Sequence, residues 1–571
     1  MTFQSLINYL TTDTLQISLP LFRPELIICA TIAAMLLVRV FSIGYKLDPF
    51  WIALIGTFVA FYYALPAGGL GAIGAIGEAH RQELFTGMLV YDSMTVFFRL
   101  FLLGFAVWFI ILVRITGLTD KQDGQDFYTL LLGSTLGMCL MASANHLMTI
   151  FLSVEMASVP SYVLAGILKG RRRSSEAALK YAVYGAGAAG VMLYGISLLA
   201  GLTGSAHIPT ITSKLISMDI PGLMSRGEGG GILMVLVLAG LMIAVGLAFK
   251  LSAVPFHFWC PDVFEGAAAE VDAFLSVASK GAAMALLIRV AIGVSTLGNP
   301  ASTTAAVPEA HSVPAKMVAF QQPAAKPAPS ALEQAADPAG LQPVRKFIVL
   351  LLAVMSAITC TFGNLAAYGQ TNIKRMLAYS TIAHAGYMLM AVAAAVQMAG
   401  SNPIGARTAI AALMFYLVAY VFMNLGAFAI VAFLRNAMGT EEIADYAGLI
   451  RTAPVTSVLF TCILISLIGL PPMIGFVGKF AIFASLYQAG GFWLIGLLVI
   501  ASINTAISLV YYLRVAKIIC IDAEPQGRAP ISLGVVPSVY LLVVALPVII
   551  YGLLPSRVLE LARAATEQLL M

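Results

Sequence analysis

Four charged residues lie inside long apolar stretches of the sequence. They are Glu155 in FLSVEMASVPSYVLAG, Lys250 in GLAFKLSAVPFHFW, Lys280 in FLSVASKGAAMALL and Lys479 in GLPPMIGFVGKFAIF. A charge at the centre of a lipid bilayer costs about 2.5–3.5 kcal/mol on insertion scales, so such a residue usually has a partner or a function. These four residues are therefore the first candidates for chemistry.

A glutamate and a lysine inside a membrane can together carry a proton. A buried lysine releases its proton more readily than an exposed one, and a nearby carboxylate opposes that release. If the separation of Glu155 and Lys250 changes, Lys250 can load a proton and then release it. The alternative is a static ion pair that only fixes helix packing. Lys280 and Lys479 favour a proton relay, because neither has an obvious carboxylate partner in its own stretch.

Two histidines could extend such a relay. His257 follows Pro255 by two positions, and His384 lies in STIAHAGYMLM. A neutral imidazole can pass a proton between its two ring nitrogens. Each histidine is an equally good candidate for a hydrogen-bonded packing residue.

Prolines accompany three of the four charges. A proline follows Glu155 and Lys250 by five positions each, and a Pro-Pro pair precedes Lys479. A proline has no N–H for the carbonyl four residues earlier and crowds that carbonyl. Unpaired backbone at membrane depth is tolerated only where it is buried in protein or faces water. Charge and proline together therefore predict hydrated pockets beside interrupted helices.

The composition places these residues in a membrane protein. The chain has 571 residues, of which 60% are hydrophobic and 10% are charged, whereas a soluble domain has about 25% charged residues. A spanning helix needs about 20 mostly apolar residues. That length predicts about fourteen helices, near residues 24–42, 50–68, 91–113, 126–144, 147–168, 178–203, 231–254, 272–296, 347–366, 373–398, 406–434, 453–470, 491–516 and 533–555.

The seventh and twelfth predicted helices resemble each other, since each combines an interior lysine with a proline break. They lie five helices apart, and a unit with an odd number of helices inserts in opposite senses when it is repeated. The fold class is therefore an all-α integral membrane protein with two inverted five-helix repeats, helices 4–8 and 9–13, in which helices 7 and 12 are broken.

Five segments follow from this division. They are an N-terminal three-helix segment (1–125), a first repeat (126–298), an Ala/Pro-rich flexible periplasmic insertion (299–344), a second repeat (345–518), and a C-terminal helix and tail (519–571).

Basic residues in the loops predict the orientation. Many of them follow odd-numbered helices: Arg171, Arg172, Arg173, Lys374, Arg375, Arg435, Arg451, Arg514 and Lys517. Such loops face the cytoplasm, so both termini are expected in the periplasm of a bacterial inner membrane. The turn after the seventh helix, with Asp262 and Glu265, is an exception.

Several functions are not supported by any motif. The sequence around Lys479, GFVGKF, is no nucleotide-binding P-loop. The six cysteines have no disulfide or metal spacing, and no basic stripe with interleaved aromatic residues suggests nucleic acid. No energy source is visible in the sequence, so if the chain pumps, something else must drive it.

Three motifs carry a family resemblance. GLAFKLSAVPFHFWCPDVFEGA with AFLSVASK, NIKRMLAYSTIAHAGYM and GLPPMIGFVGKF resemble the antiporter-like subunits of respiratory complex I, in order, from about the fourth to the thirteenth helix. The chain ends shortly after its fourteenth helix, unlike L-like subunits with their long lateral helix. Its twelfth helix carries a lysine, where M-like subunits typically carry glutamate.

The resemblance implies a role for each matching residue. Glu155 corresponds to the family glutamate of the fifth helix and Lys250 to the primary proton carrier. Lys280 corresponds to a relay toward the centre and Lys479 to a lysine near the periplasmic exit. Lys180 is either a further family lysine or a plain cytoplasmic anchor.

The resemblance also implies the partners. This chain would translocate protons as a subunit of NADH:quinone oxidoreductase, with no redox centre of its own. NADH, FMN, iron–sulfur clusters and quinone are expected in partner subunits, with an M-like subunit and a small K-like subunit as neighbours in the lipid bilayer.

The chain departs from the family pattern at AAEVDAFL. Glu270 and Asp272 add acidity near the expected cytoplasmic mouth, where they either collect protons or are simply solvated. Two alternative functions remain open at this point. One is a subunit of a multi-subunit cation/proton antiporter, and the other is a purely structural subunit whose charges hold helices together.

Overall fold

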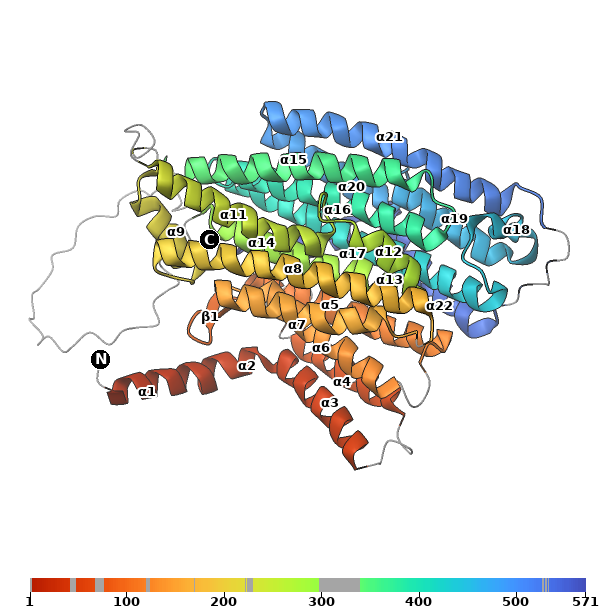
Figure 1. Ribbon diagram of the computed structural model, residues 1–571, viewed down its shortest axis with the longest axis horizontal. Coiled ribbons are helices and arrows are strands. Elements are labelled where there is room, and N and C mark those ends of the chain that lie inside the picture. Colours follow the sequence, from red (N-terminus) through yellow and green to blue (C-terminus); the bar gives the residue numbers. More distant parts are fainter. Residues whose placement is uncertain are drawn as a thin grey trace, which may run out of the picture.

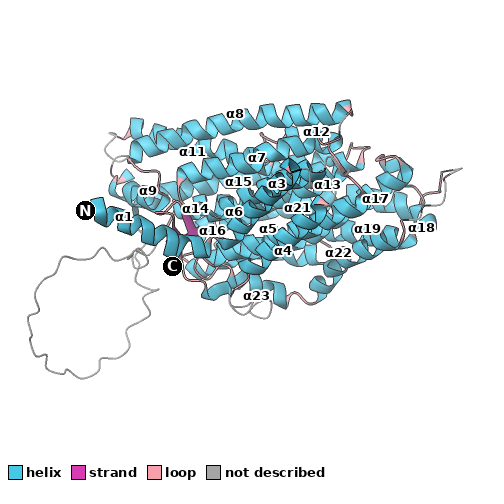
Figure 2. Ribbon diagram, turned by 90° about the horizontal axis from the view of Figure 1, so that it is seen from below, coloured by secondary structure: helices cyan, strands magenta, loops and turns pink. Residues whose placement is uncertain are grey.

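The computed structural model describes residues 3–41, 48–66, 76–119, 124–168, 170–220, 222, 229–296, 339–525, 528, 531 and 533–570. Figure 1 shows a bundle whose long helices run roughly in one direction, with the N-terminal helices at its edge. In Figure 2 the described residues are almost entirely helical. A small antiparallel hairpin, β1 (Gln82–Leu84) with β2 (Leu89–Tyr91), is the exception among these residues. The structure thus confirms the all-α fold class.

Each of the fourteen predicted spans has a helical counterpart. They are α3 (Arg23–Val40), α4 (Pro49–Ala64), α5 (Ser93–Thr116), α6 (Gly124–Ser143), α7 (Leu147–Ala165), α8 (Arg172–Thr203), α11 (Gly230–Leu251), α13 with α14 (Ala269–Phe274 and Lys280–Gly293), α15 (Gln342–Ala367), α16 (Ile373–Met398), α17 (Pro403–Met438), α19 (Pro454–Ile468), α21 (Phe492–Cys520) and α22 (Val535–Leu553).

Fewer helices meet the full length and hydropathy of a membrane span. Among the described residues ten helices do so, or eleven if α1 (Phe3–Thr12) to α3, bent by 80°, are one span. Two of the fourteen, α4 and α19, are apolar but shorter. The apolar runs of the sequence therefore located the helices well and overestimated the length of some, such as α4 and α19.

The remaining short helices lie at ends and breaks of the long ones. They are η1 (Asp13–Ser18), α2 (Leu19–Leu21), α9 (Ile208–Ser217), α12 (Trp259–Gly266), η4 (Leu275–Ser279), η6 (Ala339–Leu341), η7 (Ile443–Tyr446), α18 (Leu449–Thr452), α20 (Ile474–Ala489) and α23 (Ser556–Ala564). Most of the proposed insertion, residues 299–338, lies outside the described residues, and residues 339–344 are already helical.

The two predicted helix breaks are present. After α11 the chain leaves the helix over residues 252–258 before α12 begins, and after α19 it does so over residues 469–473 before α20 begins. Pro160, in contrast, lies inside α7, which continues to Ala165. Hydroxyl groups of Ser134 and Ser161 both donate to the carbonyl of Ala157 beside this proline, and such groups help a membrane helix tolerate proline.

Three central segments, α13–α14, α16 and α17, form the interior of the bundle. In the apolar parts of α13–α14 and α16, 94% of residues are buried, and in α17 89% are, whereas in α21 and α22 only 28% are. A helix that is buried on all sides contacts other helices and not lipid. A polar side chain on one of these central helices therefore lies in the protein interior, away from lipid.

Candidate functional site

Lys250 lies at the first helix break, one residue before the end of α11, and is only 1% exposed. Its Nζ donates to Ser158 Oγ of α7 at 2.9 Å. Glu155 lies one turn earlier on α7 and interacts electrostatically with Lys250. Among the described ion pairs, none within 4.0 Å joins these two residues, and Glu155 Oε1 is buried without a hydrogen-bond partner. The glutamate and the lysine are thus neighbours that do not touch.

Two carbonyls in the last turn of α11, those of Ala248 and Phe249, are occupied by other donors. Trp259 Nε1 donates to the carbonyl of Phe249 at 3.1 Å. The backbone N–H groups of Ser252 and Ala253 donate to the carbonyls of Phe249 and Ala248. Because the helix end is already capped in this way, the Lys250 ammonium is directed to the neighbouring helix instead.

Lys479 occupies the second break differently. It belongs to α20 and reaches back to the end of α19, where its Nζ donates to the carbonyls of Leu467 at 3.0 Å and Ile468 at 2.9 Å. The same Nζ lies 4.5 Å from the centre of the Tyr387 ring. The C-terminal end of a helix and an aromatic face both favour a cation. This lysine therefore caps the broken helix.

Lys280 lies between the two breaks, at the start of α14 and directly after the π-helical turn η4. Its side chain is 1% exposed, and its Nζ has no hydrogen-bond partner among the described residues. It interacts electrostatically with Cys260 and His384. A buried ammonium ion without a hydrogen bond is costly, and of the three interior lysines Lys280 is the one whose Nζ has no hydrogen-bond partner among the described residues.

His384 lies within electrostatic range of two of the lysines. It interacts electrostatically with both Lys280 and Lys479. Its Nδ1 lies 2.5 Å from Tyr416 Oη and its Nε2 lies 3.2 Å from Tyr512 Oη. Both ring nitrogens therefore have a hydroxyl partner, which is the arrangement that an imidazole needs to take a proton on one side and give it up on the other.

The other predicted relay residues lie apart from this row. The His257 ring packs at 4.2 Å from the Phe258 ring and 4.4 Å from the Phe362 ring, as a packing residue would. Lys180 is 38% exposed and bonds Asp262 at 2.7 Å and Glu176 at 2.9 Å. These two surface ion pairs fit a lysine that anchors the end of its helix better than a lysine that relays protons.

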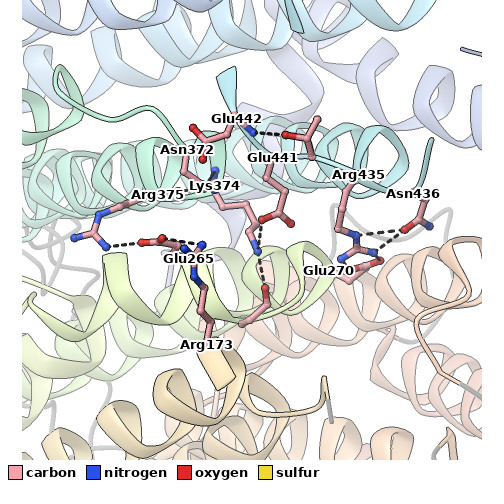
Figure 3. A network of polar contacts seen from close by, with 12 residues as sticks. Arg173, Glu265, Glu270, Asn372, Lys374, Arg375, Arg435, Asn436, Glu441 and Glu442 are labelled. Atoms are coloured by element: carbon pink, nitrogen blue, oxygen red, sulfur yellow. Dashed lines mark hydrogen bonds and ion pairs between the residues drawn. The ribbon is translucent and has the colours of Figure 1, made fainter. Parts of the chain in front are cut away.

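An ionic network covers one end of the bundle, and Figure 3 shows part of it. Its pairs are Lys180–Asp262, Arg375–Asp262, Arg375–Glu265, Arg173–Glu265, Lys374–Glu441 and Arg435–Glu270. Asp262 and Glu265, the acidic exception among the basic loops, thus pair with basic residues of α8 and α16. These ion pairs neutralise the charges of Asp262 and Glu265 within the protein.

Several residues of the site were missed by sequence reasoning. Ser158 could have been found, because a residue three positions after Glu155 lies on the same helix face. Tyr416 and Tyr512 gave no signal, since tyrosines in apolar helices are common and their contact with His384 depends on packing. The polar row therefore contains more hydroxyl groups than expected.

The arrangement can move protons among amines, imidazole and hydroxyls. The described residues contain no group of three or more His, Cys, Asp or Glu placed to hold a metal ion. The six cysteines are all free.

Comparisons with known proteins identify the family. The family described as "NADH:quinone oxidoreductase/Mrp antiporter, TM" matches residues 144–320 and 336–505. NADH-quinone oxidoreductase subunit N of Anaeromyxobacter sp. (strain Fw109-5) is 37% identical over 538 residues, covering 93% of each chain. Subunit N 2 of Sorangium cellulosum (strain So ce56) is 36% identical and covers 94% of each chain.

Solved structures agree with this assignment. A chain of respiratory complex I from Thermus thermophilus with bound aureothin is 29% identical, with a TM-score of 0.66 over 94% of this chain and 98% of that chain. A chain of the Mrp complex from Dietzia sp. DQ12-45-1b has a TM-score of 0.73 at 16% identity, over 96% of this chain and 97% of that chain, which shows the shared fold alone. The chain therefore belongs to the subunit N family of NADH-quinone oxidoreductase, a proton-translocating enzyme, and is a multi-pass membrane protein of complex I.

Proposed function

We propose that this chain carries protons across the membrane along Glu155, Lys250, Lys280 and Lys479, with His384 between the last two. NADH oxidation and quinone reduction take place in partner subunits, which hold FMN, the iron–sulfur clusters and the quinone. An M-like subunit and a K-like subunit are the expected neighbours in the bacterial inner membrane, with both termini in the periplasm.

One observation carries the proposal: three buried lysines lie at or between two helix breaks, and a histidine bonded to two tyrosines interacts with two of them. Lysines repel metal cations but exchange protons, so the row favours protons over sodium or potassium. Neither end lysine has a carboxylate within ion-pair distance among the described residues, which supports transfer over static pairing.

The sequence of events follows from the charges. When Glu155 approaches Lys250, its carboxylate stabilises the ammonium form and the lysine takes up a proton. When the two separate and Lys250 bonds the neutral hydroxyl of Ser158 instead, that stabilisation is lost. The proton then passes to Lys280, through His384 to Lys479, and out, while Lys250 reloads from the cytoplasm.

Lys250→Ala tests the relay in assembled complex I within sealed membrane vesicles. We expect NADH-driven proton pumping to fall about 100-fold or more, as is usual when a positioned proton carrier is removed. Quinone reduction, measured after the membrane is made permeable, verifies that the complex is assembled. Lys180→Ala is the matched control, since it removes a lysine from the ionic network, and it should pump normally. Normal pumping by Lys250→Ala would refute the relay.

A purely structural subunit predicts a different result. In that case, replacement of both Glu155 and Lys250 by apolar residues of similar volume, Glu155→Leu with Lys250→Met, would leave pumping intact, because a well-packed apolar pair can replace an ion pair. The proposed relay predicts that this double variant assembles and does not pump.

A further inference from the structure

Asp272 is a carboxyl group in the interior of the protein with no partner. It lies in α13 within AAEVDAFL, is 0% exposed, and neither carboxyl oxygen has a hydrogen-bond partner among the described residues. A buried carboxylate without hydrogen bonds is strongly unfavourable, whereas the neutral acid is much less so. In this geometry Asp272 therefore holds a proton.

The other charged groups near Asp272 are paired. Asp272 interacts electrostatically with Lys374, Glu441, Glu270 and Arg435. Lys374 Nζ bonds Glu441 Oε2 at 3.0 Å, and Arg435 Nη2 bonds Glu270 Oε1 at 3.0 Å. The unpaired carboxyl thus lies beside two paired ones, so pairing alone does not explain why it is present.

A path leads from Asp272 to the surface of the bundle. The Glu441 side chain is 18% exposed, its partner Lys374 is 3% exposed, and Asp272 is 0% exposed. Lys374 Nζ also donates to the carbonyl of Ala267 at 2.7 Å, at the turn that precedes α13. Figure 3 shows Lys374 reaching toward Glu441 at this end of the bundle. Burial therefore increases step by step from a partly buried carboxylate to Asp272.

A second path leads from Asp272 to the relay. Asp272 and Lys280 are eight residues apart on one continuous helical segment, which is about 12 Å at 1.5 Å per residue. The π-helical turn η4 between them contributes Ser276 and Ser279. The Ser279 hydroxyl and Lys280 Nζ are both buried without a partner. Serine hydroxyls both donate and accept hydrogen bonds, so the segment can pass a proton.

We propose that Asp272 is the proton-loading carboxyl of Lys280, and that it receives protons from the surface through Glu441 and Lys374. The O–H bond of the Asp272 acid breaks and an N–H bond forms at Lys280, which leaves a carboxylate and an ammonium ion. The positive charge of Lys374 stabilises the transient carboxylate. Water at Glu441 then supplies the proton that restores the acid. This inference rests on the proposed relay.

Asp272→Asn tests it in assembled complex I in vesicles. Asparagine fills the same space but has no proton to release, and we expect pumping to slow about tenfold or more, in keeping with the loss of a proton-transfer group. Asp272→Glu should restore most of the rate. Glu270→Gln is the control for a carboxyl-to-amide change in the same turn, because Glu270 is already paired with Arg435, and it should keep most of the pumping rate.

The pH profile separates proton loading from packing damage. Without Asp272, Lys280 must receive protons directly from bulk water, so the pumping rate of Asp272→Asn should fall more steeply than that of the unaltered protein as pH rises. Normal pumping at every pH, or an equal loss at every pH that glutamate does not restore, would overturn the inference. If the asparagine variant does not assemble, Asp272→Ser is measured under the same criteria. Failure of the relay itself would show separately, as normal pumping by Lys250→Ala.

Discussion

The two helix breaks place a lysine at the same electrostatic position by different means. Each lysine lies at the C-terminal end of the first half-helix, where a cation is favoured. Lys250 belongs to that half-helix itself, α11, whereas Lys479 reaches back from the second half-helix, α20. At the first break, an indole and backbone N–H groups cap the carbonyls. At the second break, the lysine caps them.

This difference separates a mobile lysine from a fixed one. Lys250 has one neutral hydroxyl partner, Ser158, and an unpaired carboxylate, Glu155, nearby. Its ammonium group can therefore leave the hydroxyl for the carboxylate at little cost in free energy. Lys479 has two carbonyl partners and an aromatic ring, and it would leave two buried acceptors unpaired if it moved. We infer that the first break is the switch of the relay and the second is a stationary transfer site.

The largest expected effect concerns the stability of the second break. Lys479→Met leaves the carbonyls of Leu467 and Ile468 without their donor, and each unpaired buried acceptor costs about 1–3 kcal/mol. We expect the free energy of unfolding to fall by about 2–6 kcal/mol in total. Lys250→Met should lower it far less, because it removes one bond to a hydroxyl that already donates to the Val154 carbonyl of its own helix at 2.6 Å. Thermal unfolding in detergent micelles measures both, and equal losses would contradict the comparison.

A smaller effect is expected at the partner of the mobile lysine. Ser158→Ala removes the neutral acceptor of Lys250, so that Glu155 becomes the remaining polar group nearby and holds the proton on the lysine. A hydrogen bond to a charged group contributes about 1.5–3 kcal/mol, which corresponds to pumping slowed about tenfold or more. Ser153→Ala is the control, because that hydroxyl bonds the Ile150 carbonyl of its own helix at 3.0 Å. Unchanged pumping by Ser158→Ala would remove Ser158 from the switch.

The sequence predicted the parts of this comparison that are local. The cost of a charge in lipid and the missing N–H of proline act within one helix, so the four charges and the two breaks were visible without a structure. The hydrogen-bond partners of Lys250 and His384 depend on how α11 packs on α7 and how α16 packs on α17 and α21, and no local pattern contains that information. At Pro160 the local pattern predicted an interrupted helix that is not there. Hydroxyl groups beside this proline let α7 continue through it.

The smallest expected effect concerns the cap of the first break. Trp259→Phe keeps the aromatic packing against Tyr181, whose ring lies 4.2 Å away, but removes the indole donor to Phe249. That carbonyl keeps its bond from the Ser252 N–H, but its second lone pair then competes with Ser158 for the Lys250 ammonium, and the first break comes to resemble the second. One neutral hydrogen bond contributes about 1 kcal/mol, so we expect pumping to slow about threefold to fivefold. Trp493→Phe is the matched control, because Trp493 is exposed, and it should leave the pumping rate unchanged. Faster pumping by Trp259→Phe would mean that a tethered lysine transfers protons better than a mobile one, and would reverse the roles assigned to the two breaks.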